Sequence, residues 1–222
     1  MSRTIHLNDF SFKETVQKLI REAPSAIESI VETGTFDGRG STRVFAATGL
    51  PVYTIECSEV NAARARNNLQ EFGNVVVFHG YSLLYEDMVS HILSCTFEKG
   101  VHRDFAQHER ENYLRELTYH THPVVRSNLL PLLCRNTSRQ IIFLDSAGAI
   151  GFLECSFVLQ KLNEQQLASK IIILDDVDHI KHAGSVKLIK ELGYDWVDCG
   201  RFGYSVMKKA SNPVELEADL RE

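Results

Sequence analysis

Residues 31–41 read Val-Glu-Thr-Gly-Thr-Phe-Asp-Gly-Arg-Gly-Ser and contain three closely spaced glycines. They follow an apolar run from Ala26 to Val31 and precede a helical pattern from Thr42 to Thr48. Such a change of pattern predicts a strand, a tight turn and the start of a helix. Because glycine has no Cβ atom, the backbone N–H groups of such a turn can lie directly against a ligand. The stretch therefore predicts a ligand-binding loop at the end of a strand.

The spacing of the glycines distinguishes between classes of ligand. A dinucleotide-binding loop has the pattern G-x-G-x-x-G, whereas Gly34, Gly38 and Gly40 form G-x-x-x-G-x-G, with an acidic residue two places earlier. This pattern resembles the first motif of class I S-adenosylmethionine-dependent methyltransferases. In that family the loop wraps the amino-acid and ribose parts of the cofactor. The resemblance implies cofactor contacts by Glu32, Gly34, Thr35, Phe36, Gly38, Gly40 and Ser41.

Glu56 ends the second predicted strand, residues 51–56. It lies about 20 residues after Gly34, where a ribose-binding carboxylate is expected. We therefore predict that Glu56 accepts hydrogen bonds from both ribose hydroxyls, with Cys57 beside it in the cofactor site. The alternative is that Glu56 caps the next helix, but Ser58 is better placed for that role.

A third predicted strand, residues 75–78, ends just before Tyr81 and Ser82. The resemblance implies that this turn holds the adenine edge, with Ser82 hydrogen bonding and Tyr81 stacking. Two alternatives stay open: Ser82 is only a helix cap, and Phe36 packs inward instead of covering the cofactor.

The alternation of apolar strands and helices predicts an α/β fold with a doubly wound parallel sheet. Two further strands are predicted at 140–145 and 170–176, and a short turn joins the last two, 194–199 and 203–207. That turn is too short for a parallel crossover, so it predicts an antiparallel hairpin at the end of the chain. The whole pattern resembles the seven-stranded methyltransferase sheet.

The chain is predicted to form a single domain over residues 1–222. Residues 1–25 form an N-terminal helical segment that covers one flank of the sheet or meets a second subunit. Residues 95–139 break the alternation and exceed the usual loop length, which predicts an inserted cap over the substrate pocket, or a dimerisation arm. Residues 210–222 form an acidic tail.

The overall composition favours a small-molecule substrate. The net charge of −5 gives no basic footprint for nucleic acid or a membrane surface. No apolar segment is long enough to span a bilayer and no signal peptide is evident, so we predict a cytoplasmic protein. The five cysteines are scattered and predict neither a disulfide framework nor a thiolate zinc site. A homodimer is compatible with the sequence.

Three carboxylates follow the fourth and fifth predicted strands: Asp145, Asp175 and Asp176. Carboxylate oxygens with room for water suit Mg²⁺. An Asp after strand four and an acidic pair after strand five also resemble the divalent-metal O-methyltransferases of the catechol and macrocin branches, in which these positions bind the metal. The resemblance implies the same role here, and for Asp145 a part in catalysis and cofactor binding. The alternative is that these residues only cap helices.

The sequence departs from that family where a catalytic base is expected. Catechol-type enzymes carry Lys three residues after the strand-four Asp, and macrocin-type enzymes carry Asp two residues after it; here those positions hold Gly148 and Ala147. His179 is the predicted base because imidazole titrates near neutral pH. The open alternatives are His182, His120 and His122.

These inferences together predict transfer of a methyl group from S-adenosylmethionine to a hydroxyl of a small molecule, assisted by a divalent metal. Two alternatives are a metal-free N- or carboxyl-methyltransferase and a non-catalytic module that binds the cofactor. A nicotinamide-dependent oxidoreductase is disfavoured by the glycine spacing and the terminal hairpin.

Overall fold

The computed structural model describes residues 10–23, 25–94, 107–119, 127–147, 150–182 and 184–207. Within these ranges, seven strands form one sheet in the order β3-β2-β1-β4-β5-β7-β6. The strands are β1 (Ser29–Thr33), β2 (Val52–Glu56), β3 (Val75–His79), β4 (Gln140–Leu144), β5 (Lys170–Leu174), β6 (Val197–Asp198) and β7 (Gly203–Val206). The first five pair in parallel, and β7 pairs antiparallel with both β5 and β6. The predicted doubly wound sheet with its terminal hairpin is confirmed.

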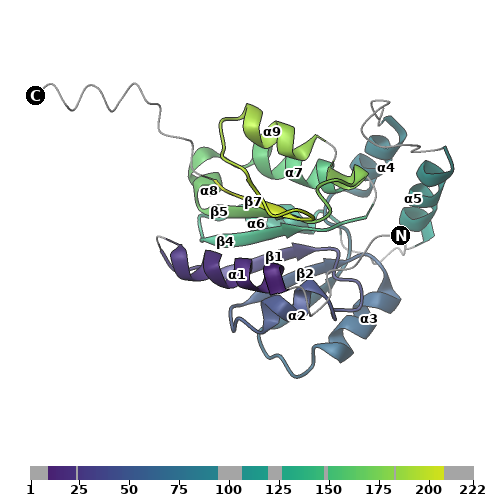
Figure 1. Ribbon diagram of the computed structural model, residues 1–222. Coiled ribbons are helices and arrows are strands. Elements are labelled where there is room, and N and C mark those ends of the chain that lie inside the picture. Colours follow the sequence, from purple (N-terminus) through teal and green to yellow (C-terminus); the bar gives the residue numbers. More distant parts are fainter. Residues whose placement is uncertain are drawn as a thin grey trace, which may run out of the picture.

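Helices cover both faces of the sheet (Figure 1). They are α1 (Phe10–Glu22), α2 (Ser41–Ala46), α3 (Glu59–Asn68), α4 (Tyr85–Ser94), α5 (Gln107–Tyr119), α6 (Leu129–Cys134), α7 (Ile150–Lys161), α8 (Glu164–Ala168) and α9 (Ser185–Glu191), with a short 3₁₀ helix, η1 (Ile180–His182). Figure 1 shows α1 and α2 on one side of the sheet and α7 and α9 on the other. In the part of the chain that the structure describes, no helix has the length and apolarity needed to cross a membrane.

The core explains why the central strands are continuous apolar runs. Every residue of β1, β4 and β5 is buried, as expected for parallel strands covered on both faces. Neighbouring residues point to opposite faces: Ile30 packs with α1 and α2, and Val31 packs with α4, α6 and α7. The alternation fixes the register of the sheet, and so the place where each strand ends.

The N-terminal helix α1 is part of the core. Phe12 is fully buried, and its ring lies 5.6 Å from Phe45, 5.3 Å from Phe143 and 5.2 Å from Phe202, measured between centroids. Of the two predicted roles for this segment, the structure therefore supports cover of the sheet. Residues 1–9 and the predicted acidic tail, 210–222, lie outside the described residues.

The region from 95 to 139 is only partly a separate segment. It contains helix α5 and also α6, which was not predicted from the sequence and in which Leu129, Leu130 and Cys134 are buried in the sheet core. Since α6 is six residues long and apolar nearly throughout, it shows no helical period from which to predict it. Its residues belong to the sheet's helix layer, so the inserted part ends before α6.

Two further differences concern helix boundaries near β5. The short helix α8 was not predicted, and the helical pattern of residues 179–192 is interrupted in the structure, which gives η1 and α9. Gly184 has a left-handed backbone conformation, with φ +87°, which ends the first segment and starts the second. This break sets the position of η1 beside the carboxyl ends of β4 and β5.

Candidate active site

The glycine loop between β1 and α2 lies against the end of β4. Gly34 has φ +81°, and a Cβ atom added there would lie 2.5 Å from the Asp145 carbonyl oxygen. Its N–H donates to the Ile55 carbonyl at 3.0 Å. Gly38 also has a positive φ, and an added Cβ would lie 2.7 Å from the Leu69 side chain. Both positions therefore require glycine. Because Gly34 has no side chain, the loop after β1 can lie against the ends of β2 and β4.

The buried carboxylate of Glu32 holds this loop in place through hydrogen bonds. Its carboxylate accepts hydrogen bonds from the hydroxyls of Ser41 at 2.5 Å, Thr42 at 2.7 Å and Thr54 at 2.7 Å. The side chain has no exposed surface, so in this structure it offers no atom to a ligand. Thr35 Oγ1 in turn contacts Thr54 Oγ1. Of the residues predicted to contact the cofactor, Glu32, Ser41 and Thr35 thus hold the loop to β2 and α2.

Burial raises the pKa of Glu32 to about 6 from 4.5; the hydrogen bonds from the three hydroxyls oppose this rise, and the charge of Glu56 adds to it. An unfolded chain therefore ionises this group at lower pH than the folded protein does, and Glu32 favours the folded state less as pH rises from 4.5 to about 6. We expect the stability of Glu32→Gln relative to the natural protein to increase by about 1.5 kcal/mol between pH 4.5 and 7. Urea unfolding of both proteins at pH 4.5 and 7 measures this difference, and an unchanged difference would contradict the assignment.

Glu56 connects the end of β2 with the glycine loop. One carboxylate oxygen accepts from the backbone N–H of Phe36 at 2.7 Å, and the other accepts from the N–H of Ser58 at 2.8 Å. Ser58 is the N-cap of α3, since its hydroxyl accepts from Asn61 N, as predicted. Cys57 Sγ lies 3.8 Å from the same carboxylate. The acidic end of β2 and the loop after β1 therefore form one continuous edge.

Phe36 is the exposed residue of this edge. Its side chain is 53% exposed, and its φ of +53° is a left-handed conformation that is rare for a bulky residue. The alternative that Phe36 packs inward is therefore not what the structure shows. Strained backbone of this kind is found disproportionately at binding sites.

The loop after β3 is held in place by elements from the middle of the chain. Tyr81 is buried, and its hydroxyl donates to the Leu117 carbonyl of α5 at 2.8 Å. The N–H groups of Leu129 and Leu130 donate to the carbonyls of Tyr81 and Ser82. Burial raises the pKa of Tyr81 to about 12. The predicted adenine-binding turn is thus rigidly fixed at the carboxyl end of the sheet.

Glu154 on α7 is a site residue that the sequence analysis missed. It is fully buried and accepts hydrogen bonds from Thr33 at 2.9 Å, Ser146 at 2.7 Å and Ser82. These three hydroxyls follow or end β1, β4 and β3, so one carboxylate holds three strand ends together. Burial raises its pKa despite those hydrogen bonds. No motif in the sequence marks a single Glu within this helix as such a link.

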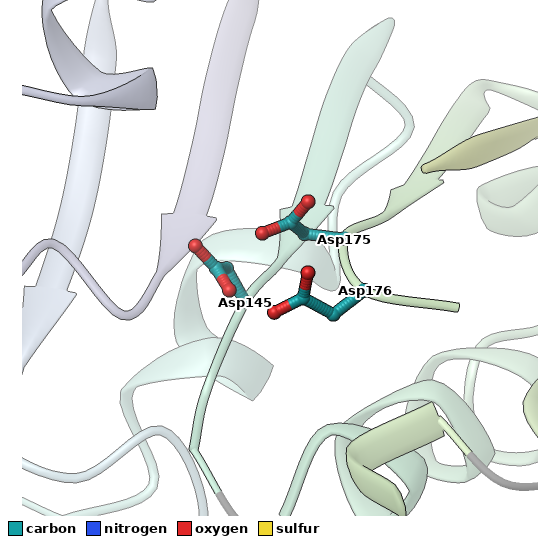
Figure 2. A group of neighbouring side chains, drawn as sticks. All are labelled: Asp145, Asp175 and Asp176. Atoms are coloured by element: carbon teal, nitrogen blue, oxygen red, sulfur yellow. The ribbon is translucent and has the colours of Figure 1, made fainter. Parts of the chain in front are cut away.

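The three predicted metal ligands do come together (Figure 2). Figure 2 shows Asp145 beyond the end of β4 and Asp175 and Asp176 beyond the end of β5, with their carboxylates turned toward one another. One carboxylate oxygen from each residue lies within 4.8 Å of the other two. Asp176 has φ +49°, another left-handed residue at the site. The three carboxylates therefore lie close enough to act together, as their positions after neighbouring strands predict.

Two cations that were not predicted lie among these carboxylates. Lys181 Nζ contacts Asp145 Oδ1 and lies 3.2 Å from Asp176 Oδ2 and 3.7 Å from Asp175 Oδ2. Arg201, in the turn between β6 and β7, donates to Asp175 Oδ2 at 3.0 Å and to Asp176 Oδ1 at 2.6 Å. Their positions depend on η1 and on the hairpin, and no local motif predicts that either cation lies beside these carboxylates.

Burial and these charges move the pKa values in different directions. Burial raises the pKa of Asp145 well above its usual value, against the attraction of Lys181, and it raises the pKa of Asp175 for the same reason. Burial also acts on Asp176, but Lys181 and Arg201 hold its pKa below the usual value. The three carboxylates raise the pKa of Lys181 although burial opposes this. Lys181 is therefore an ammonium ion at neutral pH.

The histidines predicted as bases have different surroundings. His182 is buried, its Nε2 lies 3.0 Å from the Leu144 carbonyl, and burial lowers its pKa to about 3. It therefore joins η1 to β4 as a neutral ring. His179 is exposed, and its Nδ1 accepts from Lys181 N at 3.4 Å. His120 and His122 lie outside the described residues.

The strand order, the terminal hairpin and the glycine loop define the Rossmann-like class I methyltransferase fold. A solved structure named as a candidate caffeoyl-CoA O-methyltransferase, from Staphylococcus aureus, matches with a TM-score of 0.51 and 16% identity, covering 92% of this chain and 86% of that one. A candidate O-methyltransferase from Klebsiella pneumoniae matches with a TM-score of 0.47 and 16% identity, covering 95% and 84%. No protein-family model and no curated protein sequence matches this chain. At 16% identity, the similarity to the Staphylococcus aureus structure shows the fold alone.

Proposed function

We propose that this protein transfers a methyl group from S-adenosylmethionine to a hydroxyl of a small molecule. One observation carries the proposal: the carboxylate of Glu56 at the end of β2 binds the N–H of Phe36 within the glycine loop after β1. An acidic strand end joined to a glycine loop is the arrangement that the sequence resemblance requires for a ribose and the adjoining amino-acid part of the cofactor. The hydroxyl acceptor is supported by the aspartates after β4 and β5 and by the O-methyltransferase name of the structural neighbour.

Methyl transfer from a sulfonium is an in-line displacement, so the protein's main tasks are to align donor and acceptor and to exclude water. In the proposed complex, Glu56 accepts from the ribose hydroxyls, and the backbone of Gly34 and the exposed ring of Phe36 lie along the cofactor. Cys57 lies at the adenine end, and the buried residues Tyr81 and Ser82 form the turn that holds it. Glu32 and Glu154 act as positioning residues, because each holds neighbouring strand ends without surface of its own.

The acceptor hydroxyl must lose a proton during transfer. We propose Asp145 and His179 for this role, since both lie at the carboxyl ends of β4 and β5. Burial raises the pKa of Asp145, which makes this carboxylate a stronger proton acceptor than an exposed Asp. His182 is not included, because its ring is buried and bonded to the backbone.

The donor set at Asp145, Asp175 and Asp176 has the chemistry that Mg²⁺ prefers, but its surroundings do not fit a divalent ion. Lys181 already places an ammonium within 4 Å of all three carboxylates, and Arg201 binds two of them. A metal here would lie beside two positive charges. The proposed reaction therefore includes no step through a metal.

Calorimetric titration with S-adenosylmethionine tests the proposal. We expect Glu56→Ala to bind the cofactor about 100-fold more weakly than the natural protein, because two hydrogen bonds to a charged acceptor contribute about 3 kcal/mol. Glu59→Ala is the matched control: Glu59 is an exposed carboxylate three residues away on α3, and its removal is expected to leave affinity unchanged.

Two outcomes would contradict this assignment. One is that the folded natural protein does not bind S-adenosylmethionine, which removes the proposed function. The other is that Glu56→Ala and Glu59→Ala bind equally well, which removes the role of Glu56. Incubation of the binding-competent protein with labelled cofactor and a panel of small-molecule alcohols, phenols, amines and carboxylates then tests the hydroxyl acceptor.

A further inference from the structure

The acidic cluster at the ends of β4 and β5 already contains its own cations. It comprises three carboxylates, those of Asp145, Asp175 and Asp176, with the ammonium of Lys181 and the guanidinium of Arg201. Lys181 contacts all three carboxylates, whereas Arg201 contacts only the two that follow β5. The ammonium thus holds the central position of the cluster, which is where a shared metal ion would have to bind.

Lys181 is not a surface side chain that happens to lie nearby. Its side chain is only 4% exposed, and lysine is rarely buried unless it is paired. The next residue, His182, is 1% exposed and bonds to the last carbonyl of β4. A Cβ atom added to Gly151 of α7 would lie 2.7 Å from the His182 ring, so η1 packs tightly on α7. The backbone that carries Lys181 is therefore fixed.

We propose that the ammonium of Lys181 is the permanent cation of this cluster and takes the place of the divalent metal ion that the three aspartates would otherwise bind. The inference rests on the proposed function in one respect: it makes the methyl transfer independent of a divalent metal. It also concerns the cluster itself, whatever reaction the protein carries out.

Removal of this one charge has a specific consequence. In the natural protein, the three carboxylates of the cluster are balanced by two cations, Lys181 and Arg201. Without Lys181, Arg201 is the one cation that remains beside the three carboxylates. Asp175 Oδ1 is buried and accepts no hydrogen bond from any described residue, so it has a lone pair to offer. Oxygen-preferring divalent ions bind such sets of carboxylates, together with water. Lys181→Ala should therefore create a metal site.

Titration with MnCl₂, followed by the decrease in the electron paramagnetic resonance signal of free Mn²⁺, tests this directly. We expect the natural protein to show no specific Mn²⁺ binding. The affinity of Lys181→Ala for Mn²⁺ should be at least 10-fold higher than the weakest affinity that the titration detects. Lys181→Arg is the matched control: it keeps a positive charge at the position and should gain no Mn²⁺ binding. Asp176→Asn in the Lys181→Ala background should abolish the gain.

The opposite pattern overturns the proposal. If the natural protein binds Mn²⁺ and Asp176→Asn removes that binding, the cluster is a metal site in spite of Lys181. If folded Lys181→Ala gains no affinity for Mn²⁺, the lysine does not replace a metal. Thermal unfolding with and without Mn²⁺ shows whether each variant is folded, and stabilisation of Lys181→Ala by Mn²⁺ supports the proposal.

The test remains decisive if Lys181→Ala does not fold under any condition. The comparison of the natural protein with Asp176→Asn then decides alone: Mn²⁺ binding lost in the variant overturns the proposal, and no binding by either supports it. These measurements need neither cofactor nor acceptor, so failure of the proposed methyl transfer would be seen separately. Where methyl transfer is observed, we expect the rate to be unchanged by EDTA.

Discussion

A Gly34→Ala variant is expected to lose about 3 kcal/mol of unfolding free energy, because both backbone strain and a close contact oppose the added methyl group. The backbone has φ +81° at this position, and the new Cβ would lie 2.5 Å from the Asp145 carbonyl oxygen and 2.8 Å from its carbon. Neither neighbour is a flexible side chain, so relief requires the glycine loop and the end of β4 to move apart. We expect the displacement also to abolish binding of S-adenosylmethionine.

Gly49→Ala separates the two causes. Gly49 has nearly the same backbone conformation, φ +78°, but an added Cβ would meet nothing within 4 Å. Only the strain remains, and we expect a loss of about 1 kcal/mol with cofactor affinity unchanged. Urea unfolding and calorimetry measure both quantities. If Gly34→Ala and Gly49→Ala lose equal amounts of unfolding free energy, the close contact between the glycine loop and β4 does not contribute to the loss.

Phe12→Ala is expected to lose about 4 kcal/mol of unfolding free energy, since it removes a large side chain from a closely packed site. Phe12 is fully buried and its ring packs against three other aromatic rings, within 5.2–5.6 Å between centroids. These rings come from α2, from β4 and from the residue before β7. The loss should therefore be a property of the single chain, and we expect it to be the same at all protein concentrations.

Phe36→Ala is the matched control for this change. It removes the same side chain at a position where the ring is 53% exposed, and we expect a change in stability within about 0.5 kcal/mol. Urea unfolding at two protein concentrations measures both variants. A small loss in Phe12→Ala, or one that depends on concentration, would show instead that α1 is stabilised by a second subunit.

Local patterns in the sequence were sufficient for most of the fold. The strands β1, β4 and β5 are apolar runs because they are buried on both faces, and the turn between β6 and β7 is too short for a parallel crossover. The glycine loop and the acidic ends of β2, β4 and β5 could likewise be predicted, because parallel strands bring their carboxyl ends to one edge. Each of these inferences depends on residues that are close together in sequence.

The partners of those strand ends could not be predicted in the same way. Lys181 lies 36 residues from Asp145, and Glu154 lies 121 residues from Thr33, and in both cases the pairing depends on how η1 or α7 packs on the sheet. Helix α6 was missed because a short, wholly apolar segment has no period. The sequence by itself thus determined the sheet, the loop and the set of acidic residues. Only the tertiary structure decided which groups neutralise those acids, because a buried charge is stabilised by whatever packing brings within a few ångströms of it, at any separation along the chain.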